Sequence, residues 1–145
     1  MTSHTYSRER LAELLAVAPE EDLVSTADAC LSDGAALTVL TTPEIGCIAT
    51  QVREPIGHVR FFLGNVLACH AEVRLDGTRG WAMRMGDDRA AVLAAAVCDA
   101  EVAAGRPNAG HVLDLCARIE AELGRADAEE WAHIAPTIVQ FEELT

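Results

Sequence analysis

The sequence predicts an α+β fold in a single domain, in which an antiparallel sheet with a central β-hairpin is flanked by N-terminal and C-terminal helices. Apolar residues at helical spacing occupy both ends of the chain, whereas the middle alternates between apolar and polar residues, as half-buried strands do. The 145 residues have the length of one ordinary domain, and no repeat or linker divides them. We therefore assign residues 1–145 to one domain.

The N-terminal residues predict two helices. Apolar residues repeat at i, i+3, i+4 and i+7 and form one stripe: Leu11, Leu14, Leu15 and Ala18. Pro19 suits the first turn of a second helix, because this turn leaves its amides unbonded and acidic residues follow at the positive helix end. We expect this helix to run to about Cys30 and to stop near Asp33 and Gly34.

Two short strands are expected next, at residues 35–40 and 45–52. Both ranges are rich in Val, Ile and Thr, and Thr-Thr-Pro-Glu separates them as a turn would. The stretch 53–60 contains Pro55 and Gly57 and is typical of a loop.

The clearest strand is 66–75, in which one parity is apolar: Leu67, Cys69, Ala71, Val73 and Leu75. A two-residue Asp-Gly loop to the return strand places Trp81 on the same face as Glu72, which mixes the two faces. We therefore favour a three-residue loop, residues 75–77, with Gly77 in the left-handed conformation.

This register pairs Arg74 with Thr78 and Ala71 with Trp81. It turns Trp81 and Met83 towards the helices. The opposite face then carries four polar residues: His70, Glu72, Arg74 and Arg84.

The C-terminal part predicts three helices and a strand. Asp88 can cap an alanine-rich helix over 89–104, and Asn108 can cap the next one, which Gly124 closes. Capping-box spacing predicts a short helix over 127–136, and the range 137–141 is expected to form a final strand.

Charge and composition exclude several classes of function. The net charge of −12 repels nucleic-acid backbones and anionic membranes, so neither is an expected partner. The chain has no lysine, which rules out a lysine Schiff base and a P-loop. No apolar run of about 18 residues spans a bilayer, and the N-terminus lacks a secretory pattern, so we expect a cytoplasmic protein. Five cysteines without CxxC spacing are expected to be buried thiols and to form no disulfide framework.

His70 and Glu72 are the weak candidates for catalysis. Their i, i+2 spacing places both on one strand face, where they can act as acid and base. We favour a solvated charge cluster with Arg74 and Arg84, because nothing supplies a nucleophile or an oriented third group. No metal site is expected: Cys69 and His70 point to opposite strand faces, and no HxxxH, HExxH or CxxC spacing occurs.

The middle of the chain holds six of the eleven arginines. Arginine is favoured at interfaces and binds carboxylates or phosphates through two hydrogen bonds. Four of them are candidate contacts for an anion or a partner protein: Arg60, Arg74, Arg84 and Arg89. The alternative is a solvated surface, since residues 43–90 carry as many acids as bases.

Five segments together resemble a known family. They are residues 43–46 (PEIG), 60–65 (RFFLGN), 73–80 (VRLDGTRG), 86–89 (GDDR) and 139–141 (VQF). Their order is similar to that in PhnG, the G subunit of the bacterial carbon–phosphorus lyase core complex, and the likeness covers nearly the whole chain.

The resemblance implies an accessory subunit in phosphonate breakdown. It implies partners of the H, I, J and L types and a homo-oligomer when the chain is isolated. The H, I and L proteins act with the G subunit to displace adenine from MgATP with an alkylphosphonate, which gives a ribose 1-phosphonate 5-triphosphate. This chain would then be a non-catalytic subunit of that ribose 1-methylphosphonate 5-triphosphate synthase, a transferase. It would bind no cofactor itself, and MgATP would be the substrate of the complex.

The chain departs from the family pattern at several places. Loop 53–59 replaces a glycine-rich loop, Asn65 replaces an acid, and His70 replaces an arginine. Ala91 and Leu93 stand where the family tends to carry a histidine and a glutamate.

Two other functions fit the sequence. One is a stand-alone enzyme that uses His70 and Glu72, and the other is a self-associating structural or regulatory protein without the complex. For association we expect either the Phe61-Phe62 segment or the predicted strand 137–141 to supply the apolar surface.

Overall fold

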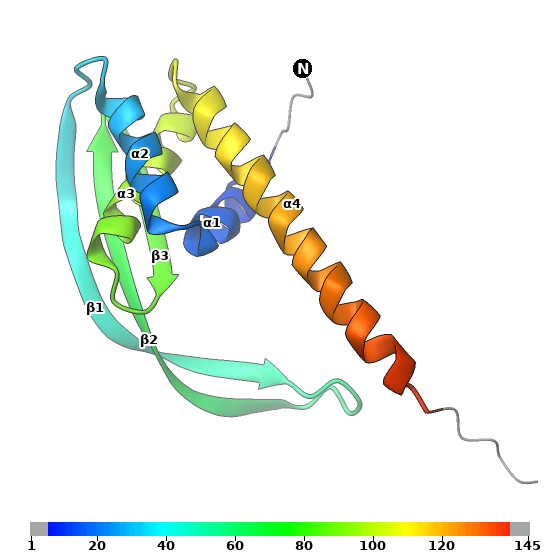
Figure 1. Cartoon of the computed structure of the whole chain (residues 1–145). Coiled ribbons are helices and arrows are strands. Elements are labelled where there is room, and N and C mark those ends of the chain that lie inside the picture. Colours follow the sequence, from blue (N-terminus) through cyan, green and yellow to red (C-terminus); the bar gives the residue numbers. More distant parts are fainter. Residues whose placement is uncertain (1–5, 140–145) are drawn as a thin grey trace, which may run out of the picture.

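The computed structural model describes residues 6–139 and confirms the predicted α+β single-domain arrangement (Figure 1). Helices and strands follow in this order: α1 (Arg8–Val17), α2 (Glu20–Leu31), β1 (Leu37–Arg53), β2 (Arg60–Leu75), β3 (Thr78–Met85), α3 (Arg89–Ala103), α4 (Ala109–Ile134) and a 3-10 turn η1 (Ala135–Thr137). The sheet is antiparallel in the order β1-β2-β3. Within residues 6–139, no helix combines the length and apolar character needed to cross a bilayer.

Helix α3 is the centre of the core. It packs against β3, β2, α2, α1 and α4, so it has almost no solvent-facing side. This position explains its alanine-rich sequence, because a helix surrounded by other elements is mostly apolar on every side and needs small side chains to fit. Asp88 caps it as predicted, since its side chain accepts a hydrogen bond from the amide of Ala91 at 2.9 Å.

The N-terminal helices agree with the sequence. Leu11, Leu14 and Leu15 are buried, and Ser7 caps α1 through the amide of Arg10. In α2, Pro19 stands at the N-cap rather than inside the first turn, and the helix ends at Leu31 before Gly34, whose φ is 80°.

The prediction of two strands over residues 35–52 is wrong. Residues 37–53 form one strand, and Pro43 lies in it. The pairing with β2 slips between Val39 and Thr41 and again between Thr41 and Glu44, so the predicted turn is an irregularity in the strand. β1 is an edge strand, where a proline need not interrupt the hydrogen bonds to β2. The loop predicted over 53–60 is confirmed for residues 54–59, whereas Arg53 and Arg60 pair with each other in the strands.

The predicted hairpin register is also wrong. The β2–β3 loop has two residues, because Leu75 pairs with Thr78 and Glu72 pairs with Trp81. Asp76 and Gly77 both have positive φ (44° and 89°), as in a type I′ turn, whose twist matches that of the strands.

The inward face of β3 therefore carries small residues. Gly80 and Ala82 are buried opposite Val73 and Ala71, whereas Trp81 is 41% exposed. An alanine-rich helix that approaches the sheet closely leaves no room for an indole on that face.

The C-terminal predictions hold only in part. Residues 109–134 form one helix, so Gly124 does not end it and the short helix predicted over 127–136 is not a separate element. Asn108 occupies the N-cap position without a capping hydrogen bond from its side chain. Residues 137–139 form no strand, and residues 140–141 of that prediction lie outside the described residues.

Candidate functional site

The sheet has the predicted polar face, but Arg84 does not lie on it. Cross-strand pairing forms three rows on the sheet face opposite α3: Thr38–Arg74–Arg79, Thr41–Glu72–Trp81 and Glu44–His70–Met83. His70, Glu72 and Arg74 share this face as predicted. Arg84 pairs with the buried Cys69 and lies on the other face, so its predicted place on the polar face is wrong.

The two catalytic candidates are engaged with neighbouring strands. His70 Nε2 lies 4.0 Å from Glu44 Oε2, and Glu72 forms an ion pair and hydrogen bond with Arg79. Within residues 6–139, His70 makes no hydrogen bond to a hydroxyl or thiol group. The geometry is that of a cross-strand charge cluster on an open face.

Arg84 is a half-buried cation beneath the end of α1. Its Nη1 donates to the Leu15 carbonyl oxygen at 2.7 Å, and its buried Nε has no hydrogen-bond partner among residues 6–139. Burial lowers the pKa of the guanidinium, and the nearby Asp88 opposes this shift. Arg84 thus ties β3 to α1 from inside.

The observed register, with Arg84 on the inward face of β3 and Trp81 on the outward face, can be tested by replacing each side chain. Arg84→Ala is expected to lower the free energy of unfolding by about 2 kcal/mol, because it removes a charge-assisted hydrogen bond and leaves the Leu15 carbonyl without it. Trp81→Ala is expected to cost about 1 kcal/mol or less, because the indole is partly exposed. Urea denaturation of both variants measures the order, and a greater loss for Trp81→Ala would contradict the register.

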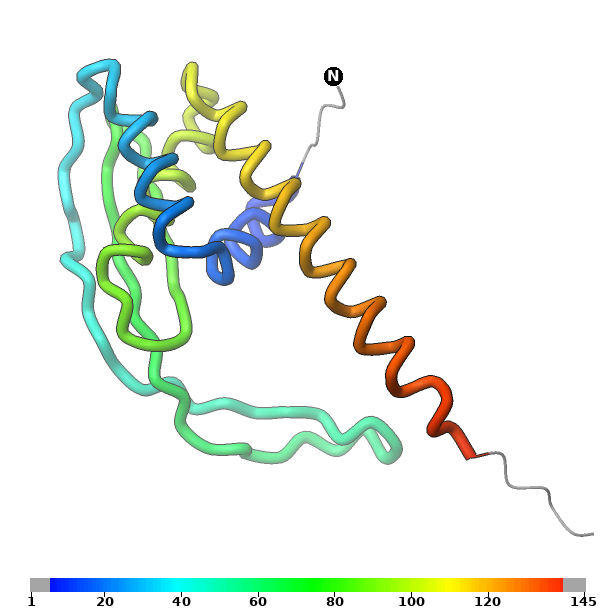
Figure 2. The backbone as a smooth tube through the Cα atoms, in the orientation of Figure 1, coloured from blue at the N-terminus to red at the C-terminus, as the bar shows by residue number. Residues whose placement is uncertain are grey.

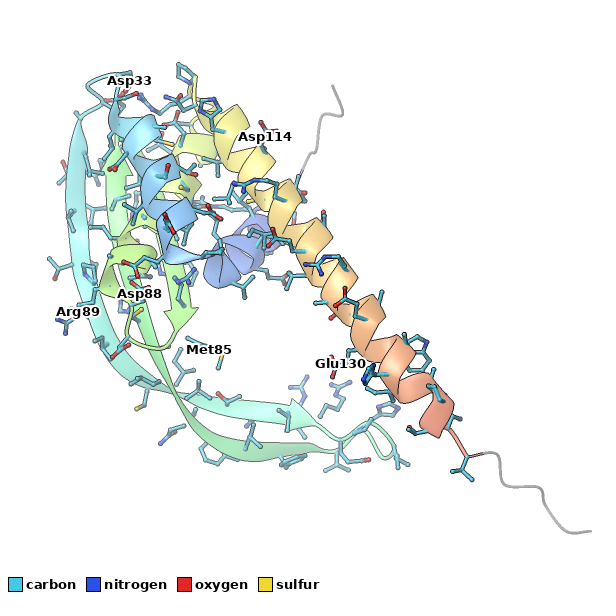
Figure 3. All side chains as sticks on the ribbon, in the orientation of Figure 1. Asp33, Met85, Asp88, Arg89, Asp114 and Glu130 are labelled. Carbon is cyan, nitrogen blue, oxygen red and sulfur yellow. The ribbon has the colours of Figure 1, made fainter. Side chains whose placement is uncertain are left out.

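The other arginine candidates are exposed but dispersed. Arg60 begins β2, Arg74 lies in β2 near the hairpin turn, and Arg89 projects from the first turn of α3 (Figure 3). The structure does not bring these three together. Among the described residues, no cluster of histidine, cysteine or acidic side chains could hold a metal ion. Of the five cysteines, which are all free, only Cys47 is exposed.

The sheet extends well beyond the helices that cover it. In Figure 2 the far parts of β1 and β2 bend away from the body together. We call residues 45–67 the arm; it contains no buried residue. Its exposed apolar side chains include those of Ile45, Ile48, Ile56, Val59, Phe61, Phe62, Leu63 and Leu67. The predicted Phe61-Phe62 segment is part of this surface, but the sequence did not indicate how far it extends.

Helix α4 also projects beyond the core. Its buried residues end at Ile119, and we call residues 121–134 the tail. The positions that continue the buried stripe at i+4, i+7, i+11 and i+15 from Ile119 are Leu123, Ala126, Glu130 and Ile134. Figure 3 shows Glu130 on the side of α4 that faces the arm. An amphipathic helix normally covers such a stripe with another element.

The two edges of the sheet differ in their protection. At β3, Asp99 accepts a hydrogen bond from the Trp81 amide at 2.9 Å, and Arg8 donates to the Arg79 carbonyl at 3.0 Å. β1 pairs with β2 on one side, and most of its residues are exposed. Its arm portion therefore offers both apolar side chains and an open strand edge, which are features of protein-binding surfaces.

Comparison with known proteins identifies a family whose sequences this chain matches. A family model described as "Phosphonate metabolism protein PhnG" matches residues 6–145, nearly the whole chain. No curated protein matches the chain with significant similarity.

Proposed function

The chain belongs to the PhnG family of phosphonate metabolism proteins, and from that premise we propose that it is an accessory subunit of the phosphonate-processing machinery. It supports the transfer of the ribose triphosphate moiety of MgATP onto an alkylphosphonate, with release of adenine. Its partners are proteins of the H, I, J and L types. It binds no cofactor of its own, and MgATP is the substrate of the assembled complex in the cytoplasm.

The exposed apolar arm carries this proposal. A two-stranded ribbon is marginally stable in water by itself, and residues 45–67 have no buried side chain to support it. Covering such a ribbon with another protein stabilises it and buries its apolar side chains. A subunit whose role is contact needs this kind of surface. By contrast, His70 only lies 4.0 Å from Glu44, and Glu72 is paired with Arg79.

Reconstitution tests the proposal directly. Purified H-, I- and L-type proteins with MgATP and methylphosphonate are expected to release adenine only when this chain is added. The chain alone is expected to release none. His70→Ala should support release as well as the wild type does, because His70 is not assigned to the chemistry. Adenine release by the chain alone that disappears in His70→Ala would establish an enzyme instead.

The same surface supports self-association of the isolated chain. Edge strands with few charges pair readily with other strands, and residues 45–52 of β1 carry no charged side chain. We therefore propose that the chain forms homo-oligomers when its partners are absent. The exposed Arg74 and Arg89 remain proposed partner contacts together with Arg60.

A further inference from the structure

The molecule has far more surface than a compact chain of its mass. Its accessible area is 9646 Å², whereas a compact monomer of 15.5 kDa exposes about 7,200 Å². The excess is roughly 2,400 Å² by the same relation. This excess is larger than the roughly 800 Å² that each partner contributes to a standard interface. The arm and the tail are the described segments that leave the body.

The tip of the arm carries an unneutralised pair of like charges. Arg53 and Arg60 are directly opposite each other in the β1–β2 ladder and line one shallow hollow with Gln51 and Val52. Within residues 6–139, neither guanidinium forms an ion pair. The adjacent Glu54 uses its carboxylate to accept hydrogen bonds from the amides of Ile56 and Gly57.

Like charges that face each other across two strands destabilise the ribbon. A carboxylate placed against the hollow would offset one of the two positive charges, and a second would neutralise the pair; the guanidinium fork suits such contacts.

The tail has the opposite charge. Residues 121–134 carry four acids and one arginine, a net charge of −3, whereas the arm has two arginines and one acid, a net charge of +1. Glu130 interrupts the apolar stripe on the side facing the arm. A surface that covers the tail must therefore be apolar with a basic group near Glu130.

We propose that the arm and the tail grip one partner subunit of the phosphonate machinery from two sides. The contacted surface of that partner is apolar, with carboxylates against Arg53 and Arg60 and a basic group against Glu130. This inference rests on the proposed function. A second copy of the chain could supply both the carboxylates and the basic group only if the arm of each copy contacted the tail of the other. It would also bring a second net charge of −12, which repels the first.

Charge reversal at the arm tip tests the grip. The tagged chain is co-expressed with the H-, I-, J- and L-type proteins, and the partners recovered with it are quantified. Arg53→Glu combined with Arg60→Glu is expected to reduce recovery about tenfold or more, because each partner carboxylate then meets a like charge. Glu130→Arg is expected to reduce it as well. The matched control is Arg118→Glu, which reverses an exposed arginine on α4 outside the tail and should recover partners as the wild type does.

Two further measurements keep the test interpretable. Urea denaturation of the isolated chains should give the same midpoint for wild type and variants, because every substituted side chain is exposed. In the recovered wild-type complex, amide hydrogen exchange over 45–53 and 60–67 should slow relative to the isolated chain measured at a concentration where it is monomeric.

The outcomes are distinct. Loss of partners in the arm-tip variant, with retention in Arg118→Glu, supports the grip. Partner recovery equal to that of the wild type in both charge-reversed variants overturns the grip and leaves the accessory function standing. A wild-type chain that recovers none of the four subunit types overturns the accessory function and the grip with it. A homodimer that the arm-tip reversal dissociates, with partner recovery unchanged, assigns the arm to a second copy and also overturns the proposal.

Discussion

Replacing Gly80 with alanine is expected to lower the free energy of unfolding by about 3 kcal/mol or more, at the upper end of overpacking effects. An added Cβ at this position would lie 2.6 Å from Ala100 Cβ and 2.7 Å from the Ala100 amide nitrogen, and closer still to the Ala96 carbonyl oxygen. These are atoms of the α3 backbone and of a side chain too short to move aside. Relief requires α3 to separate from β3, which opens the centre of the core.

The same substitution at Gly124 is the matched control. This glycine lies inside α4, and a Cβ there meets nothing within 4 Å. Gly124→Ala is therefore expected to stabilise the chain by about 0.5–1 kcal/mol, since alanine favours helix over glycine by that amount. Urea or thermal denaturation of the two variants gives the comparison. Equal stability of Gly80→Ala and the wild type would show that α3 does not approach β3 as described.

Truncating Glu101 is expected to have a comparable effect. Glu101→Ala should lower the free energy of unfolding by about 3 kcal/mol, because it removes two hydrogen bonds of a fully buried carboxylate and leaves a cavity. Glu101 accepts from the Arg106 Nε at 2.8 Å and from the Asn108 amide at 2.9 Å. The same guanidinium also contacts Asp33, at 2.7 Å, and Asp76.

Arg106 is thus a bridge between three parts of the fold. Asp33 precedes β1, Asp76 lies in the β2–β3 turn, and Glu101 lies in α3. Without the Glu101 carboxylate the loop between α3 and α4 loses two hydrogen bonds to that side chain. The Arg106 amide still donates to the Glu101 carbonyl oxygen, and the Arg106 guanidinium still contacts the two aspartates.

Two other glutamate substitutions make the second prediction specific. Glu101→Gln should cost less than Glu101→Ala, because the amide keeps the volume and still accepts from Asn108. Glu129→Ala removes an exposed i, i+4 pair with Arg125 and should change stability by no more than about 0.5 kcal/mol. Denaturation midpoints of all three variants give the test, and a Glu101→Ala variant as stable as Glu129→Ala would contradict the assigned role.

The ion pairs of the two buried acidic residues were the feature that local sequence patterns predicted least well. Asp99 and Glu101 lie in the alanine-rich stretch where the sequence predicts a buried helix, and nothing near them in sequence indicates what neutralises Asp99. Its partner Arg8 lies in α1, with Nη2 and Oδ2 2.7 Å apart. Such long-range ion pairs depend on how the helices cross the sheet, which single-sequence periodicity does not encode.

The candidate site shows the same division. Apolar character at Phe61 and Phe62 and the concentration of arginines in the middle of the chain were visible in the sequence. The arm was not, because whether a strand continues beyond the helices depends on how much of the sheet those helices cover. Gly124 and the acidic residues after it favoured a break in the last helix, yet a glycine inside a helix costs only about 1 kcal/mol, so the helix continues as the tail.

The sequence alone was enough to predict the two N-terminal helices, the hairpin of β2 and β3, the helix cap at Asp88 and the inward face of β2, but not the continuity of β1 or of α4. These features depend on neighbouring residues and on local hydrophobic periodicity, so they can be inferred before folding. The face of β3 that packs inward was set by tertiary packing. Because α3 lies so close to β3, only side chains as small as those of Gly80 and Ala82 fit between them, and the more hydrophobic Trp81 is turned outward. Likewise, only the extent of helix coverage decided that residues 45–67 and 121–134 leave the core with their apolar side chains exposed.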